Sequence, residues 1–172
     1  MQKFFWKQGI KHYSPLCYNS PRASFTSFMY SMLKTIGPII KIQEREVKES
    51  INALEKERKK ISIENLNNTN PAIELSKWIT DIPIIYYPAG LYAAAFRFKN
   101  CIQENGKMHA MIEDVVEASH NNIVAWEKPS KIKPILLQGR DDFIKTKERW
   151  KILKKYFEIN WIEYKEVKTS SG

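Results

Sequence analysis

The second half of the chain alternates helical patterns with short apolar runs, and this alternation limits the folds open to it. The apolar runs lie at 82–88, 107–115, 133–139 and 160–167, and helix-forming stretches separate them. They show little polar alternation, as expected of strands that are buried on both faces. Strands that alternate with helices predict an α/β fold, a doubly wound parallel sheet flanked by helices.

The stretches between the strands are predicted to be helices with one face on the sheet. These helices are expected at 72–80, 90–105 and 141–157, with a loop and a short helix around 117–126. Asp141 and Asp142 are predicted to open the last helix, where carboxylates favour the positive end of the dipole. In 90–105 the face toward the sheet comprises Leu91, Ala95, Phe98 and Ile102.

The first part of the chain predicts a different, purely helical organisation. Ser20 is expected to be the N-cap of a helix, with Pro21 in its first turn and Gly37-Pro38 as its stop. A charge-rich helix is expected from about Ile39 to Ile61, before a polar linker. The first helix has an apolar stripe that should be core or interface: Phe25, Phe28, Met29, Met32, Leu33 and Ile36.

These patterns divide the chain into three parts. Residues 1–19 are an unassigned leader, 20–70 a helical connecting segment, and 71–172 an α/β domain. The last predicted strand is followed by "KTSSG" and no helix, whereas a doubly wound sheet needs a helix to cover that face. We therefore expect the α/β domain to be incomplete, either truncated or completed by another polypeptide.

Composition restricts the partners and the cellular compartment. The formal net charge is +9, which predicts anionic partners, but the basic residues are mixed with glutamates as on a solvated helix face. Nucleic acid is therefore not expected as a partner. Cys17 and Cys101 are far apart and predict neither a disulfide framework nor a metal site. The absence of an export signal and of a membrane-spanning run in the sequence favours a cytoplasmic protein without a membrane partner.

The sequence lacks the common cofactor-binding motifs, so the loops after the strands are the places to search. It contains no GxGxxG, Walker or HExxH pattern, and no cofactor or metal ion is predicted. Ligands of open α/β sheets bind at the carboxyl ends of the strands, which directs attention to 89–90, 117–122 and 139–142. His12 and His109 are interpreted as structural. Core or interface anchoring is the simplest role of Trp126, Trp150 and Trp161.

Three charged or titratable residues occupy positions that suit chemistry. Arg22 puts a cation in the first turn of its predicted helix, which a nearby anion would compensate. Glu104 lies near a helix end, just before the expected stop at Asn105-Gly106, where the dipole would raise its pKa and make it a better general base. His120 follows Ser119 at a predicted helix start, where neutral imidazole is favoured. An exposed surface glutamate and a capped structural histidine remain the alternative interpretations.

Two segments resemble a known enzyme family. "YAAAFRFKNCIQENGK" and "EASHNNIVAW" resemble the second sugar-isomerase (SIS) domain of archaeal and bacterial bifunctional phosphoglucose/phosphomannose isomerases, and "SPRASF" resembles the element before that domain. Glu104 and His120 are sixteen positions apart, as in the family. Where the family usually has Asn-Glu-Asn-Ala-Lys and His-Asn-Glu-Ile, the chain has Gln-Glu-Asn-Gly-Lys at 103–107 and His-Asn-Asn-Ile at 120–123.

The resemblance implies a reaction and a partner. It implies isomerisation of glucose 6-phosphate or mannose 6-phosphate to fructose 6-phosphate through an enediol, without a metal ion. Glu104 would be the base, His120 would assist ring opening in the partner subunit's site, and Arg22 would stabilise the anionic intermediate. The family's serine/threonine phosphate loop and a lysine of its last helix have no counterpart here, so a homodimer or association with a missing N-terminal half is expected. A noncatalytic phosphosugar-binding regulatory module is the alternative.

Overall fold

The computed structural model describes residues 9, 12–20 and 22–169, and the chain divides into two compact units, Met1–Asn52 and Ala53–Gly172. Pro21, expected in the first turn of a helix, lies outside the described residues. The boundary between the units, after Asn52, falls within a helix. The two units are described separately. The three-part division of the sequence stays a prediction.

The first helix begins later than the sequence predicts. Helix α2 spans Phe25–Ile36 and its N-cap position is Ser24, so the prediction of Ser20 as N-cap is wrong. The Ser20 carbonyl instead accepts hydrogen bonds from the Ser24 N–H and the Ser24 hydroxyl, at 3.2 and 3.0 Å. Because the buried Ser24 hydroxyl also accepts from the Tyr18 N–H at 2.7 Å, these residues close a separate turn before the helix.

The second helix, α3, spans Glu44–Ile61 and also begins later than the predicted Ile39. Two N–H groups, of Ile39 and Ile40, donate to the Ile36 carbonyl and end α2 in a turn. Helix α3 then starts where Glu44 and Glu46 place carboxylates at the positive end of the dipole. Neither helix has a fully buried residue, and Met32 is 60% exposed. The α2 stripe is therefore not a buried core, and its role as an interface stays a prediction.

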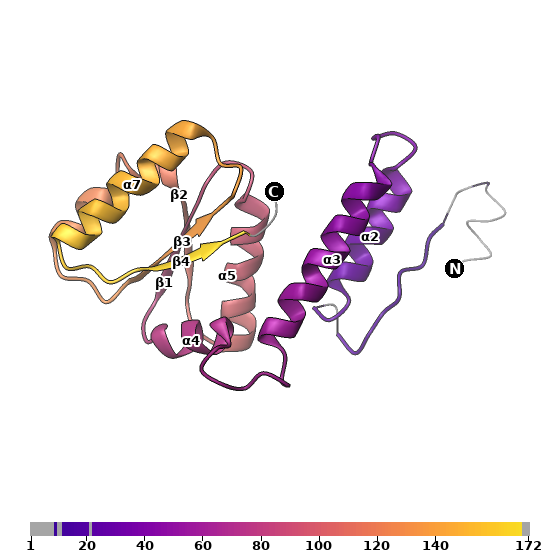
Figure 1. Ribbon diagram of the computed structural model, residues 1–172, viewed down its shortest axis with the longest axis horizontal. Helices are drawn as coiled ribbons and strands as arrows, with labels where there is room; N and C mark the ends of the chain where they lie inside the picture. The colour runs from indigo at the N-terminus through magenta and orange to yellow at the C-terminus, as the bar shows by residue number, and fades with distance from the viewer. Residues whose placement is uncertain (1–8, 10–11, 21, 170–172) are drawn as a thin grey trace. The chain divides into compact units, whose positions relative to one another are not determined.

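The second unit confirms the predicted parallel α/β fold (Figure 1). Its four strands form one sheet in the order β2-β1-β3-β4, and every neighbouring pair is parallel. The elements, in chain order, are α4 (Pro71–Trp78), β1 (Pro83–Tyr87), α5 (Tyr92–Gly106), β2 (Met111–Asp114), α6 (Val115–Ala118), the 3-10 helix η1 (Asn122–Glu127), β3 (Lys133–Gln138), α7 (Ile144–Ile159) and β4 (Lys165–Lys168).

Helices cover both faces of this sheet, because alternate residues of each strand point to opposite sides. On one face Ile84, Tyr86 and Leu136 pack with α6 and with α7, whose Trp150, Leu153 and Phe157 are buried. On the other face Ile85, Ile135 and Leu137 pack with Ala95 of α5 and with side chains of α4. The predicted sheet-facing residues of α5, Leu91, Ala95, Phe98 and Ile102, all belong to this second cluster, so that prediction is confirmed.

Strand register places the four strand ends level with one another. Tyr87 of β1 pairs with Asp114 of β2, and Gln138 of β3 pairs with Lys168 of β4. The carboxyl ends of the strands therefore form one edge of the sheet, and the loops that precede the strands form the opposite, amino edge. The positions of Glu104 and His120 are described below relative to these two edges.

Two local predictions in this unit are wrong. His109 was expected within a strand, but β2 begins only at Met111, and His109 lies exposed in the loop before it. Asp141 and Asp142 do not open α7: its N-cap position is Phe143, and no side chain caps it. The Asp142 carboxylate is engaged elsewhere, as described below.

Candidate functional site

Glu104 lies exposed in the last turn of α5. The helix continues through Asn105 and Gly106, one residue beyond the expected stop, and Lys107 takes the left-handed conformation with φ of 55°. Since α5 starts after the carboxyl end of β1 and runs back to the start of β2, its last turn lies at the amino edge of the sheet. Glu104 is therefore not near the loops in which a ligand was expected.

A surface hollow adjoins this helix end. It has a volume of about 420 Å³ and is lined by Gln103, Lys107, Met108 and His109. Glu104 and Lys107 are three residues apart in the chain, a spacing that brings side chains together at a helix surface. The hollow itself is lined by an ammonium group and an imidazole, two groups that can bind an anion and exchange a proton.

Lys107 and His109 are residues that sequence reasoning did not select. His109 was interpreted as structural because a strand was expected through it, and Lys107 was considered only as part of the motif at 103–107. The signal was the spacing itself, since Glu104, Lys107 and His109 fall within six residues around a helix stop. The loop there, rather than a strand, allows Lys107 and His109 to line one hollow.

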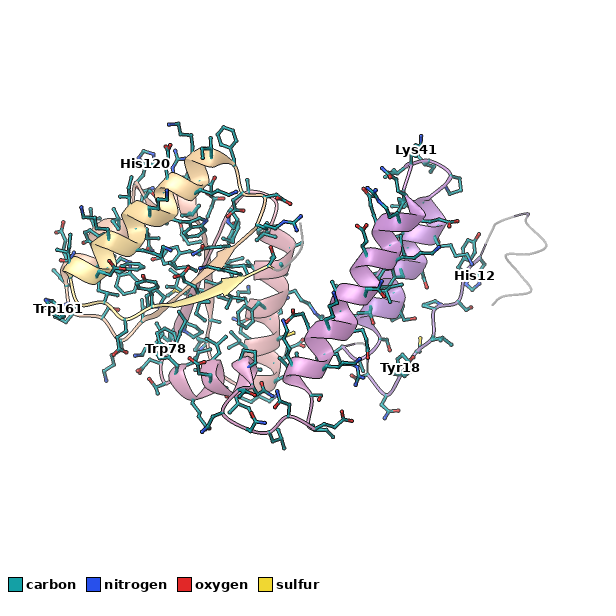
Figure 2. All side chains as sticks on the ribbon, in the orientation of Figure 1. His12, Tyr18, Lys41, Trp78, His120 and Trp161 are labelled. Carbon is teal, nitrogen blue, oxygen red and sulfur yellow. The ribbon has the colours of Figure 1, made fainter. Side chains whose placement is uncertain are left out.

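His120 lies at the opposite, carboxyl edge, in the turn between α6 and η1 (Figure 2). Its side chain is exposed and its N–H donates to the Glu117 carbonyl at 2.9 Å, so it ends α6 instead of starting a helix. Helix α6 itself is capped by Asp114, whose carboxylate accepts from the Val116 N–H at 2.8 Å. The last residue of β2 thus fixes the start of the short helix that leads to His120.

A partly buried hydrogen-bond network links the helix after this turn, η1, to the sheet. The Tyr86 hydroxyl donates to Oδ1 of Asn122 and accepts from Nε1 of Trp126 at 3.0 Å. Burial of Tyr86, which is 1% exposed, raises the pKa of its hydroxyl and keeps it protonated. Asn122 is the residue that stands where the resembled family usually has glutamate, and here its amide carbonyl ties η1 to the sheet. The two tyrosines at the end of an otherwise apolar strand, Tyr86 and Tyr87, were the available signal for this network.

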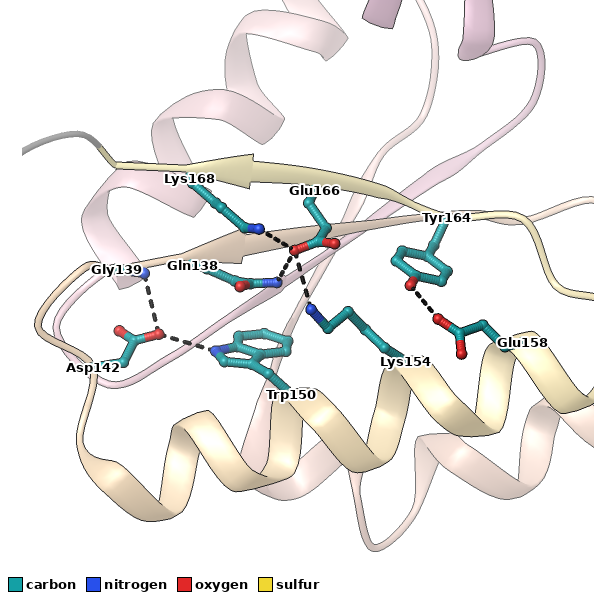
Figure 3. Close-up of polar contacts among 9 residues, drawn as sticks. All are labelled: Gln138, Gly139, Asp142, Trp150, Lys154, Glu158, Tyr164, Glu166 and Lys168. Carbon is teal, nitrogen blue, oxygen red and sulfur yellow. Dashed lines mark hydrogen bonds and ion pairs between the residues drawn. The ribbon is translucent and has the colours of Figure 1, made fainter.

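Other polar groups at the carboxyl edge are occupied by structural contacts (Figure 3). The Asp142 carboxylate accepts from the Gly139 N–H at 3.1 Å and from Nε1 of Trp150 at 3.0 Å, which binds the loop after β3 to α7. The Glu166 carboxylate of β4 accepts from Gln138 at 3.0 Å and forms ion pairs with Lys154 and Lys168 at 3.3 and 2.8 Å.

These ion pairs control the charge of Glu166. Desolvation raises the pKa of the Glu166 carboxyl, but the hydrogen bonds and charges of Lys168 and Lys154 outweigh it and hold the pKa below its ordinary value. Glu166 therefore stays ionised in neutral solution and joins β4, β3 and α7. This cluster joins the strand edge to α7, and both lysines are paired with the same carboxylate.

Within the second unit, the fold does not bring Glu104 and His120 together in one place. Glu104 precedes β2 and His120 follows it, so the length of the strand, about 13 Å for four residues, separates the two edges on which they lie. Arg22 belongs to the first unit, where it is exposed in the turn before α2. Glu104 and His120 of the same chain therefore do not lie close together.

Within the described residues, two further kinds of feature are missing. No three histidine, cysteine, aspartate or glutamate side chains gather there as ligands for a metal ion. Among the helices of that same part of the chain, none combines the length and the apolar character needed to cross a membrane.

The second unit is a parallel α/β domain with helices on both faces of its sheet, the arrangement of SIS-type proteins. The family model of the bacterial phospho-glucose isomerase C-terminal SIS domain matches residues 68–172, well over half of the chain. The chain therefore belongs to this family. A search of curated proteins gives no match.

Proposed function

We propose that the chain contributes proton-transfer residues to an aldose-ketose isomerase acting on glucose 6-phosphate and mannose 6-phosphate, with fructose 6-phosphate as the product. The observation that carries the proposal is the family match over 68–172, which includes an exposed glutamate beside a hollow with a lysine and a histidine. Family membership supports handling of sugar phosphates, and the specific reaction is our proposal. Two free cysteines, Cys17 and Cys101, agree with a cytoplasmic location.

In the proposed reaction the Glu104 carboxylate removes the proton from C2 of the open-chain aldose. The C–H electrons form the C1–C2 double bond of an enediol as the carbonyl oxygen at C1 takes up a proton. The protonated Glu104 then delivers its proton to C1, while the O2 proton is lost and the carbonyl re-forms at C2. Arg22 would stabilise the negative charge of the intermediate.

His120 would act on the sugar ring in the site of a second subunit. This assignment is supported by the separation of Glu104 and His120 on opposite edges of the sheet, because one base and one ring-opening residue must reach the same sugar. Two chains, or this chain and another polypeptide, would then build each site. A homodimer or a complex with an N-terminal half is therefore part of the proposal.

The first test is Glu104→Gln in the protein isolated with its native assembly. This substitution keeps the shape and removes the base, so we expect kcat for glucose 6-phosphate to fall about 10²–10⁴-fold while fructose 6-phosphate still binds. Glu148→Gln, which alters an exposed glutamate of α7, is the matched control and should leave turnover unchanged. Near-normal turnover of Glu104→Gln would refute the assignment.

A noncatalytic phosphosugar-binding module is the second candidate. It is favoured by three departures from the resembled family near the candidate residues: Gln103 and Gly106 on either side of Glu104, and Asn122 near His120. If the chain is a noncatalytic module, calorimetric titration with fructose 6-phosphate should give a heat of binding. The native assembly should then not isomerise the sugar phosphate. A flat titration would count against it. The mass of the native assembly decides which partner chains to include in both assays.

A further inference from the structure

Trp161 occupies an unusual position at the end of α7. Its side chain is 93% exposed and its backbone has a positive φ of 57°. The Ile162 N–H donates to the Phe157 carbonyl at 2.9 Å and the Trp161 N–H to the Glu158 carbonyl at 3.3 Å. This is the Schellman pattern, in which the residue with positive φ is usually glycine because any side chain there is strained.

The helix-ending hydrogen bonds explain the positive φ at position 161. They do not explain why the residue there is a tryptophan. Glycine or asparagine would close the helix with less strain. A fully exposed indole also gains nothing from burial, since neither hydrophobic cluster of the second unit includes it. Trp161 is therefore not a core residue, and its role as an interface anchor stays a prediction, whereas Trp150 is buried and Trp126 is partly buried.

A hollow of about 650 Å³ lies beside Trp161, at the amino edge of the sheet. Three segments line it: Asp81 before β1, residues 126–133 from the end of η1 to the start of β3, and residues 160–163 before β4. Trp126 forms part of the wall and is held in place by its hydrogen bond to Tyr86. Figure 2 shows Trp161 at the end of α7, away from the His120 turn.

The lining offers both hydrogen-bond donors and acceptors, with little net charge. It includes three lysines, at 128, 131 and 133, and three carboxylates, at 81, 127 and 163. Lys133 pairs with Glu163 at 3.4 Å and lies 5.0 Å above the Trp78 ring, whereas Lys128 and Lys131 are exposed. A surface of this kind does not select a strong anion, but it suits a neutral ligand with many hydroxyl groups.

We propose that Trp161 and this hollow form a binding site for a hexose ring, separate from Glu104 and His120. Carbon-bound hydrogens on one face of a sugar ring carry partial positive charge and pack against the negative face of an indole. The ring hydroxyls would then donate to the carboxylates and accept from the lysines of the hollow. The site is noncatalytic, and Lys128 and Lys131 are the exposed lysines of its lining.

The test is calorimetric titration of the full chain with glucose and with maltose. Trp161→Asn removes the indole and installs a residue that tolerates positive φ, so we expect the melting temperature to be equal or higher and sugar affinity to fall by roughly tenfold. Phe143→Ala removes an exposed aromatic ring from the opposite end of α7 and should leave affinity unchanged. Absence of binding at the highest soluble sugar concentrations, or equal affinity in Trp161→Asn, overturns the proposal.

Parallel titrations separate the sugar ring from a phosphate and this site from the isomerase site. They use glucose 6-phosphate and inorganic phosphate, with Glu104→Gln as a second background. Tighter binding of glucose 6-phosphate that Lys128→Ala weakens supports a phosphorylated hexose, and equal binding of both sugars supports an unphosphorylated one. Inorganic phosphate binding as tightly as glucose 6-phosphate would overturn ring recognition. Loss of isomerase activity in Glu104→Gln with sugar binding intact distinguishes the two proposals.

Discussion

At the scale of single residues, close contacts limit which side chains fit in the loops at the carboxyl ends of the strands. Gly139 is the clearest case, because a Cβ at this position would lie 2.5 Å from Oδ1 of Asp142. The same carboxylate accepts hydrogen bonds from Gly139 and Trp150 and cannot move without losing them. Asp142 was expected at a helix start, and its actual contacts depend on Trp150, eight residues away along the chain.

The Gly139→Ala variant tests this contact. We expect the free energy of unfolding to fall by about 1–3 kcal/mol, because Asp142 must move and leave the buried Trp150 N–H without its acceptor. Urea denaturation measures the change. In an Asp142→Ala background the same glycine substitution should cost much less, and additive effects of the two changes would contradict the mechanism.

At the scale of elements, boundaries depend on which residue can adopt the conformation that ends a helix. The sequence predicts a stop at Asn105-Gly106, since glycine commonly ends helices. In the structure Gly106 is still helical and Lys107 takes the left-handed conformation. This one-residue shift matters for the candidate site, because Lys107 then leads into the hollow lined by His109.

The Gly106→Ala variant discriminates between the two boundaries. A methyl group there would meet Met108 and Ile102 at 3.7–3.9 Å, which is ordinary contact, so we expect a gain of about 0.5–1 kcal/mol from helix propensity. Thermal and urea unfolding give the value. Lys107→Gly should also stabilise, because it relieves the positive φ. Destabilisation by Gly106→Ala would mean that α5 ends where the sequence predicts.

At the scale of the whole molecule, the fold holds tyrosines in surroundings that couple stability to alkaline pH. The Glu158 carboxylate accepts a hydrogen bond from the Tyr164 hydroxyl at 3.0 Å. Burial and this neighbouring negative charge raise the pKa of Tyr164 to about 12. In the unfolded chain a tyrosine ionises near pH 10. Between these two values the folded state keeps a proton that the unfolded state has lost.

Stability should therefore fall as pH rises from about 10 to about 12, and the contribution of Tyr164 is fully present below pH 10. Unfolding free energies measured across this range should decrease less steeply in Tyr164→Phe. Glu158→Gln keeps a hydrogen-bond acceptor without the negative charge, so it should lower the pKa of Tyr164 seen in a tyrosinate absorbance titration. An unchanged pKa in that variant would contradict the assigned cause.

The sequence by itself determined the local patterns and the family. Its apolar runs and helical faces predicted the four strands, the parallel sheet and the sheet-facing side of α5. These features can be predicted because buried residues recur at regular spacings along a strand or helix. The quoted segments around Glu104 and His120 also identified the family that the comparison confirmed. Both kinds of information are carried by residues close together along the chain.

Only the tertiary structure decided where chain segments meet. The connection from β1 through α5 to β2 places Glu104 and His120 on opposite edges, and contacts across the fold engage Asp142 and Asn122 in structural networks. Trp150 and Trp161 are the same residue type eleven positions apart, yet one is buried and the other exposed. The difference arises because burial depends on which face of α7 meets the sheet and on where that helix ends, and both are settled by packing between distant segments.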